Sequence, residues 1–117
     1  MRRLQADELL RRPVVARGIR VGRVADVIFD PAATRVVGFD VLCGDGLHRF
    51  LPFPVPFAAR EGLEVGSTLT LLDADELAFY LRHGRSLAAA AELRDARVRA
   101  DGVVEAPDVA GGGAARC

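Results

Sequence analysis

Three aspartates lie close together in the sequence and are the first residues that could do chemistry: Asp26, Asp30 and Asp40. Converging carboxylates can bind a metal ion or share the work of a general acid and a general base. No accompanying histidine or glycine-rich loop makes such a cluster specific for a reaction here. We therefore expect turn chemistry at Asp30, before Pro31, and outward-facing side chains at Asp26 and Asp40.

The histidines and cysteines do not form a recognisable metal motif. His48 and His83 lack metal-ligand spacing to each other and to Cys43. We expect His48 on the outer face of a strand, His83 at the end of a helix, and Cys43 as a buried structural thiol. The sequence also has no phosphate loop, zinc motif or nucleophile elbow. It therefore predicts a protein that is not an enzyme and has no cofactor or metal.

Arginines near the N-terminus are candidates for binding rather than catalysis. Formal net charge is zero over the whole chain, but only Asp7 and Glu8 oppose the arginines before residue 25. Such a face could contact RNA or an acidic partner. It lacks the interleaved aromatic residues of a stacking platform, so a solvated surface is the alternative. The candidate contact residues are Arg11, Arg12, Arg17, Arg20 and Arg23.

Residues 18–43 position the aspartates, because they form two β-strands around a turn at Asp30 and Pro31. The second strand alternates with a period of two that places Phe39 on the inner face. Val24 and Val27 cannot share one face of an unbroken strand, so either a β-bulge near Ala25 resets the register or both faces are partly covered. The residues predicted to be buried are Val27, Phe29, Val37, Phe39, Val41 and Leu71.

Glycines and prolines mark the boundaries of further short elements. Gly38 lies inside the second strand, which predicts a tight bend or a close backbone approach there. The sequence predicts a helical turn within 4–10, strands at 14–16, 47–53 and 68–72, and a brief pairing at 57–60.

The pattern changes to a helical one after Asp73. Asp73 with Glu76 three residues later is typical of a helix N-terminus. We expect Leu77, Tyr80 and Leu81 on one helix face, and a left-handed stop at Gly84. A second, alanine-rich helix is expected from residue 87 to about residue 95.

Residues 50–57 carry alternating prolines and large apolar side chains. Proline removes backbone donors, so this stretch must lie at an edge or in an extended connection. Phe53, Val55 and Phe57 then share a face. That face either forms a docking surface for a second copy or another protein, or is covered by the helix that carries Leu77 and Tyr80.

Three motifs follow one another at offset positions: Gly22-Arg-Val-Ala-Asp-Val-Ile-Phe-Asp30, Arg35-Val-Val-Gly-Phe-Asp-Val41 and Arg49-Phe-Leu-Pro52. Together they resemble the PRC-barrel domain over roughly residues 10–73. That family includes the cytoplasmic domain of the photosynthetic reaction-centre H subunit and the C-terminal domain of the ribosome maturation factor. The resemblance implies a module that docks on other proteins. The maturation factor points to an alternative, an RNA- or ribosome-associated assembly factor, although this chain lacks that factor's separate N-terminal domain.

The expected fold is mainly β: a small antiparallel barrel of five or six strands, followed by one or two short C-terminal helices. We expect a barrel over 1–73, a helical hairpin packed on it over 74–96, and an extra strand or a flexible tail over 97–117. The chain has no candidate membrane span and no signal peptide, which predicts a cytoplasmic location. The expected partners are another protein, a second copy, or RNA or a ribosomal protein.

Overall fold

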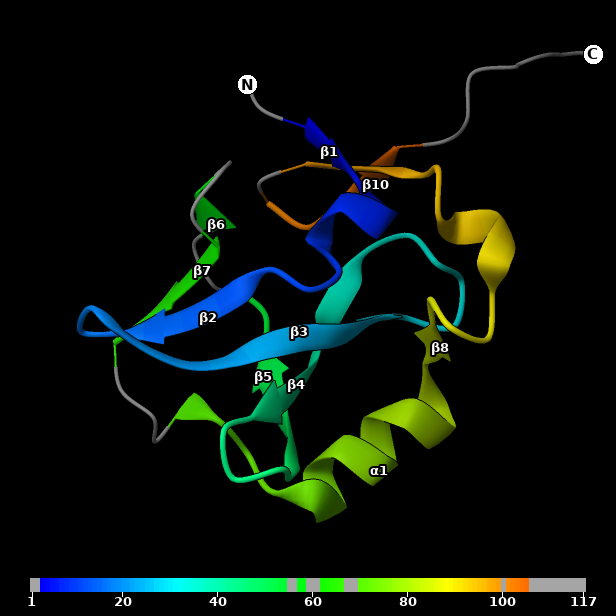
Figure 1. Ribbon diagram of the computed structural model, residues 1–117. Helices are drawn as coiled ribbons and strands as arrows, with labels where there is room; N and C mark the ends of the chain where they lie inside the picture. The colour runs from blue at the N-terminus through cyan, green and yellow to red at the C-terminus, as the bar shows by residue number, and fades with distance from the viewer. Residues whose placement is uncertain (1–2, 55–56, 59–61, 67–69, 100, 106–117) are drawn as a thin grey trace, which may run out of the picture.

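The computed structural model describes residues 3–54, 57–58, 62–66, 70–99 and 101–105 (Figure 1). The strands are β1 (Arg3–Gln5), β2 (Pro13–Ala16), β3 (Ile19–Phe29), β4 (Val36–Cys43), β5 (His48–Pro52), β6 (Phe57–Ala58), β7 (Gly62–Val65), β8 (Arg85–Ser86), β9 (Arg97–Arg99) and β10 (Val104–Glu105). The helices are the 3-10 helices η1 (Ala6–Leu9) and η3 (Ala91–Leu93) and the α-helix α1 (Ala74–His83).

The main sheet follows the order β5-β4-β3-β2-β7-β6, and β8 pairs with β3 at one end. All its pairings are antiparallel except the parallel pairing of β2 with β7. No strand pairing joins β5 to β6 within the described residues, so the sheet keeps an open seam there. The mainly antiparallel, barrel-like fold expected from the sequence is confirmed.

The long strands β3 and β4 carry two register shifts, and these decide which side chains face the core. The first lies between Val24 and Asp26, so the bulge, one of the two alternatives left open by the sequence, is present and lets Val24 and Val27 both be fully buried. The second register shift lies near the end of β3, and it places the Val36 side chain in the main core. Val37 instead packs, half-buried, in a second cluster. The prediction that Val37 shares the face of Phe39 is therefore wrong.

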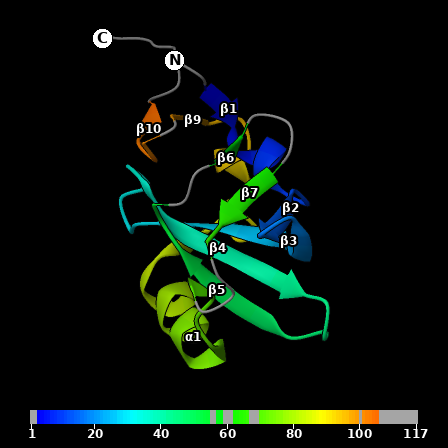
Figure 2. The ribbon, with the colours of Figure 1, turned by 90° about the vertical axis from the view of Figure 1, so that its left-hand side faces the viewer.

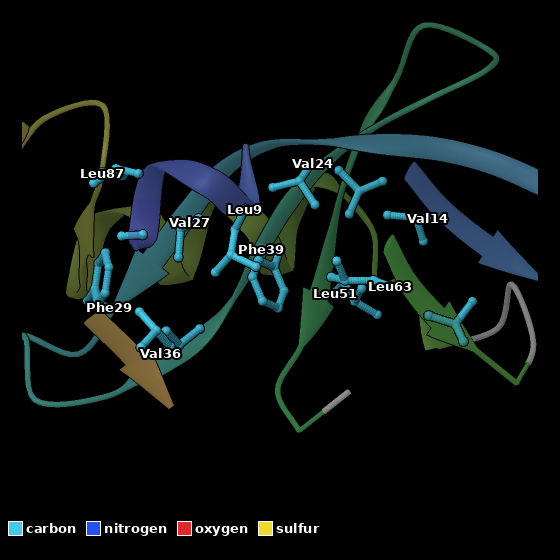
Figure 3. Packing of buried hydrophobic residues seen from close by; sticks show 14 of the residues in the cluster. Leu9, Val14, Val24, Val27, Phe29, Val36, Phe39, Leu51, Leu63 and Leu87 are labelled. Carbon is cyan, nitrogen blue, oxygen red and sulfur yellow. The ribbon is translucent and has the colours of Figure 1, made fainter. Parts of the chain in front are cut away.

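The main core lies inside the curved sheet, where Phe39 is surrounded by side chains from several strands and from η1 (Figure 3). Phe29, Phe39 and Val41 are completely buried, as predicted. Leu71 is only partly buried and packs at the edge of this core.

The helix α1 begins where the sequence predicts, because the Asp73 side chain accepts hydrogen bonds from the backbone N–H groups of Asp75 and Glu76. It lies against the outer face of the sheet beside β5 (Figure 2). Leu77 is buried there, and Tyr80 stacks on Phe50 with ring centroids 4.2 Å apart. This second cluster covers one end of the outer face of the sheet.

Two details at the end of α1 differ from expectation. Leu81 is exposed instead of packing beside Leu77. Gly84 has a φ of −114°, so it is not a left-handed stop. Glycine is needed there for space, because a Cβ atom would lie 2.5 Å from the backbone oxygen of Phe29.

The chain after α1 completes the fold with strands instead of a second α-helix. A turn and η3 occupy the alanine-rich stretch, and β9 pairs with both β1 and β10 (Figure 1). Leu87 and Val98 from this segment are buried in the main core. The predicted second helix is wrong because contacts with the barrel outweigh the helix propensity of alanine.

The strands around the β6–β7 region also differ from expectation. β7 occupies Gly62–Val65, where no strand was expected. Residues 68 and 69 of the strand expected at 68–72 lie outside the described residues. Within the rest of that range, Leu72 forms only an isolated bridge with Phe50. β7 pairs in parallel with β2 and so adds a strand to the sheet that the sequence does not predict.

Gly38 offers a direct test of close packing inside the sheet. A Cβ atom there would collide with the Phe50 ring and lie 2.7 Å from the backbone oxygen of Leu51. We expect Gly38→Ala to lower the free energy of unfolding by about 1–3 kcal/mol, since overpacking forces the neighbours to move. Urea denaturation measures this. The control is Gly44→Ala, because nothing lies within 4 Å of that Cβ position; equal stability of the two variants would contradict the packing.

Candidate docking surface at the open end of the barrel

The β2–β3 hairpin carries three of the five candidate arginines, and its turn lies at one end of the main sheet (Figure 1). Its tight turn is made by Arg17 and Gly18, both with positive φ (53° and 80°), as a two-residue hairpin turn requires. Arg17, Arg20 and Arg23 are all exposed. Within the described part of the chain, neither Arg20 nor Arg23 forms an ion pair, so their positive charges are available to a partner.

The other two candidate arginines lie at the start of β2. Arg11 is exposed and its backbone N–H donates to the Val24 carbonyl. Arg12 is half-buried, and its Nε donates to the Glu8 carbonyl oxygen at 2.9 Å. The five arginines thus divide into three along the hairpin and two beside η1.

An open hollow lies where the β2–β3 hairpin meets the turn between β4 and β5, and this part of the molecule is called the open end of the barrel. The two segments are joined by a hydrogen bond from the Gly44 N–H to the Val21 carbonyl. The hollow has a volume of about 400 Å³ and is lined by Val21, Cys43, Gly44, Asp45, Arg49 and Leu71. A second hollow of about 240 Å³ shares part of this wall and is lined by Arg20, Val21, Gly22, Arg23, Leu42, Cys43 and Gly44.

The charged residues that line the larger hollow neutralise each other. Both terminal nitrogens of Arg49 donate to the Asp45 carboxylate, at 3.1 and 2.9 Å. This hydrogen bonding lowers the pKa of Asp45 and raises the pKa of Arg49. Asp45 also accepts from the Leu47 N–H and so holds the turn. The remaining lining side chains are apolar or a thiol.

Two large apolar side chains stand exposed at the tips of the two hairpins. Ile19 is 68% exposed and Leu47 is 57% exposed. Each is two residues away in sequence from a residue that lines the hollow: Ile19 from Val21, and Leu47 from Asp45. A hollow with apolar walls, apolar tips and arginines beside it is typical of a surface that binds a partner.

The aspartates are arranged differently from what the sequence predicts. Asp26 is buried, and its Oδ1 accepts hydrogen bonds from the N–H groups of Val27 at 2.8 Å and Ala88 at 3.1 Å. The expectation of an outward-facing Asp26 is wrong, because the turn after β8 covers it. Burial raises the pKa of Asp26. This carboxylate holds the segment after α1 against the barrel.

Asp40 is the cross-strand neighbour of Asp26 and lies 2.7 Å from His48, measured from Oδ1 to Nδ1. A carboxylate that orients a histidine is one part of a nucleophilic triad, which also needs a nucleophile within reach of the imidazole. The Cys43 thiol is instead directed at the Val41 carbonyl. In the described residues no group of three or more histidine, cysteine, aspartate or glutamate side chains could hold a metal ion.

Asp30 performs the predicted turn chemistry. Its carboxylate accepts hydrogen bonds from the backbone N–H and hydroxyl of Thr34, both at 2.6 Å, and from the Arg35 N–H at 3.2 Å. The β3–β4 connection therefore uses Asp30 for structure.

Two substitutions of Asp26 separate its hydrogen bonds from its charge. We expect Asp26→Ala to lower the free energy of unfolding by about 1–3 kcal/mol, because the buried N–H groups lose their acceptor. Asp26→Asn keeps an acceptor oxygen and removes the charge, so its stability should match or exceed that of the wild type at neutral pH.

The pH dependence of the two proteins follows from the raised pKa of Asp26. Its stabilising contribution is complete below the pKa of the unfolded chain and is lost as pH rises through the higher pKa of the folded state. The wild type should therefore lose stability relative to Asp26→Asn as pH rises through that range. Urea denaturation at several pH values measures the free energy of unfolding of both proteins. If the advantage of Asp26→Asn over the wild type shrinks as pH rises, the assignment is contradicted.

Of the candidate docking residues in the proline-rich stretch, the structure describes the side chain of Phe53 only. Phe53 is half-buried and packs against the main core. A Cβ atom on Gly102 would lie 2.6 Å from its ring, so the chain after β9, and not α1, covers it. The side chains of Val55 and Phe57 lie outside the described residues, and docking through this stretch stays a prediction.

The sequence identifies the exposed arginines as candidates, and their role in binding stays a prediction; it does not single out Ile19, Leu47 or the hollow. One signal was available: each of these apolar residues directly follows a glycine at a turn, where exposure is expected. The hollow had no such signal, because its walls come from β3, β4, β5 and Leu71.

Comparisons with known proteins agree with this architecture. A family model of the PRC-barrel domain matches residues 1–69. A search of curated proteins found no significant match, and a search of solved structures found none either. In the described part of the chain, no helix has the length and apolar character needed to cross a membrane. Because the family model covers more than half of the chain, the chain belongs to the PRC-barrel domain family, whose members are generally non-catalytic modules.

Proposed function

We propose that this chain is a non-enzymatic protein–protein interaction module. The observation that carries the proposal is the open end of the barrel, which has the hollow, the exposed Ile19 and Leu47, and two arginines, Arg20 and Arg23, that form no ion pair among the described residues. Binding energy in protein interfaces is concentrated in apolar anchors and arginines that become buried on association.

Family membership supports the same proposal, since the PRC-barrel is a module rather than a catalytic domain. The Asp40–His48 pair does not compete with it. The His48 side chain is about half exposed, and the pair lies on the outer face of the sheet without a described nucleophile. Its hydrogen bond is expected to fix the β4–β5 hairpin.

RNA or ribosome binding is the second candidate function. One observation favours it: Arg17, Arg20 and Arg23 are exposed along a single hairpin, as a phosphate-binding surface requires. The described residues that line the two hollows include no aromatic side chain on which bases could stack.

Capture of partners from an extract of the source organism tests the two functions against each other. The tagged full chain is used with and without ribonuclease treatment, and a retained protein is purified and its binding confirmed by calorimetry. We expect a defined protein partner that survives ribonuclease. Retention that disappears with ribonuclease would favour RNA binding, and retention of neither protein nor RNA would contradict both functions.

A further inference from the structure

We propose that the open end of the barrel binds an acidic peptide segment of a partner protein, with one large apolar side chain of that segment entering the hollow. The proposal rests on the proposed function and adds the chemistry of the partner. It follows from the size, the lining and the charge of this end of the molecule.

The hollow is suited to an apolar anchor. Its volume of about 400 Å³ lies in the range of about 300–1,000 Å³ that is typical of ligand sites. Val21 and Leu71 form apolar walls at the edge of the main core. A side chain entering from a partner would therefore extend the core through the open end.

The charges around the hollow select an acidic segment. Asp45 is already paired with Arg49, so the carboxylate that lines the hollow does not repel an acidic peptide strongly. Arg20 and Arg23 line the adjoining hollow and have no ion pair among the described residues. A guanidinium can bind a carboxylate through two parallel hydrogen bonds, so these arginines would hold acidic residues that flank the anchor.

Ile19 and Leu47 lie at the turns of the two hairpins that meet at the hollow. Both are more than half exposed and would lose contact with water when a peptide crosses the hollow. Exposed ion pairs contribute little individually. The apolar contacts should therefore supply most of the affinity, and the arginines should supply specificity and salt dependence.

Other occupants fit this surface less well. A bilayer would contact the two apolar tips but would leave the hollow beneath them unfilled. RNA would use the arginines but would find no aromatic side chain among the described lining residues. A protein segment uses the hollow, the tips and the arginines together.

A library of random linear peptides displayed on phage, selected against the folded full chain, is the probe. We expect selected peptides to be rich in aspartate and glutamate around a large apolar residue. Fluorescence anisotropy then measures their affinity for the wild type and for two double variants, Arg20→Glu with Arg23→Glu, and Ile19→Ser with Leu47→Ser.

We expect each double variant to weaken binding by about tenfold or more, because each removes exposed groups of the proposed interface. The matched control is Phe79→Ser with Leu81→Ser, two exposed apolar residues on α1, which should change affinity by less than about twofold. Circular dichroism establishes that each variant is folded. Raising salt from about 0.05 to about 0.5 M should weaken binding by about fivefold, since the arginine contacts are screened.

Several results would overturn the proposal. Selected peptides without acidic residues would show that Arg20 and Arg23 do not select an acidic segment. Peptides that bind both double variants as tightly as the wild type would place the site elsewhere, yet the proposed interaction function would survive. If no peptide is selected and the source extract yields no protein partner, both proposals fail. Single-stranded RNA or anionic vesicles that bind through Arg20 and Arg23 when no peptide does would replace the peptide with another class of partner.

Discussion

Replacing Phe39 by alanine should lower the free energy of unfolding by about 3–5 kcal/mol. Phe39 is completely buried at the centre of the main core, between strands on both sides of β4 (Figure 3). The substitution removes a large apolar surface and leaves a cavity that the surrounding strands cannot fill, since β4 is paired along both edges. Urea denaturation followed by circular dichroism gives the change in stability.

Phe79→Ala is the control for this substitution. Phe79 is 46% exposed on α1, and its loss should cost less than about 1 kcal/mol. A loss below about 1 kcal/mol for Phe39→Ala would mean that Phe39 does not face the core. The register of β3 against β4 would then be wrong.

The segment after α1 should also be required for stability. Leu87 lies beyond the residues matched by the family model, yet it is buried in the same core as Phe39. Its N–H donates to the Val27 carbonyl at 2.8 Å, which joins the segment to β3. Leu87→Ala should therefore lower the free energy of unfolding by about 2–5 kcal/mol. A chain that ends after residue 84 should fail to fold cooperatively, because it loses Leu87 and Val98 from the core.

Leu81→Ala is the matched control, since Leu81 is 39% exposed and lies in the neighbouring helix. It should change stability by less than about 1 kcal/mol. A truncated chain with the cooperativity and stability of the full chain would contradict a shared core. The barrel would then fold without the segment that follows α1.

The parts of the fold that depend on neighbours in sequence could be predicted. Alternation in β4, the bulge after Val24 and the cap at Asp73 all leave local patterns of side chains. Val37 was placed on the wrong face because the second register shift depends on how β4 pairs with the end of β3. A period of two shows which residues share a face only while the register is unbroken.

Contacts between distant segments could not be predicted. Asp26 was expected at the surface because its partner, the N–H of Ala88, lies 62 residues further along the chain. The alanine-rich stretch has strong helix propensity, but tertiary contacts such as the hydrogen bond from Leu87 to β3 override it. β7 was missed because it is only four residues long, begins with a glycine and pairs in parallel with β2.

The candidate site could be predicted only in part. A count of charges near the N-terminus is enough to find Arg17, Arg20 and Arg23. The hollow arises only when the ends of β3, β4 and β5 meet Leu71, so it requires the folded arrangement. Sequence reasoning therefore identified the charge of the surface and missed its shape.

Chemical-shift mapping by NMR tests docking at the open end of the barrel most directly. The labelled full chain is titrated with the tightest-binding selected peptide, and amide shifts are followed residue by residue. The largest changes should fall on Arg20, Val21, Gly44 and Leu47. Changes centred on α1 or on Phe53, with none at these four residues, would contradict docking at the open end.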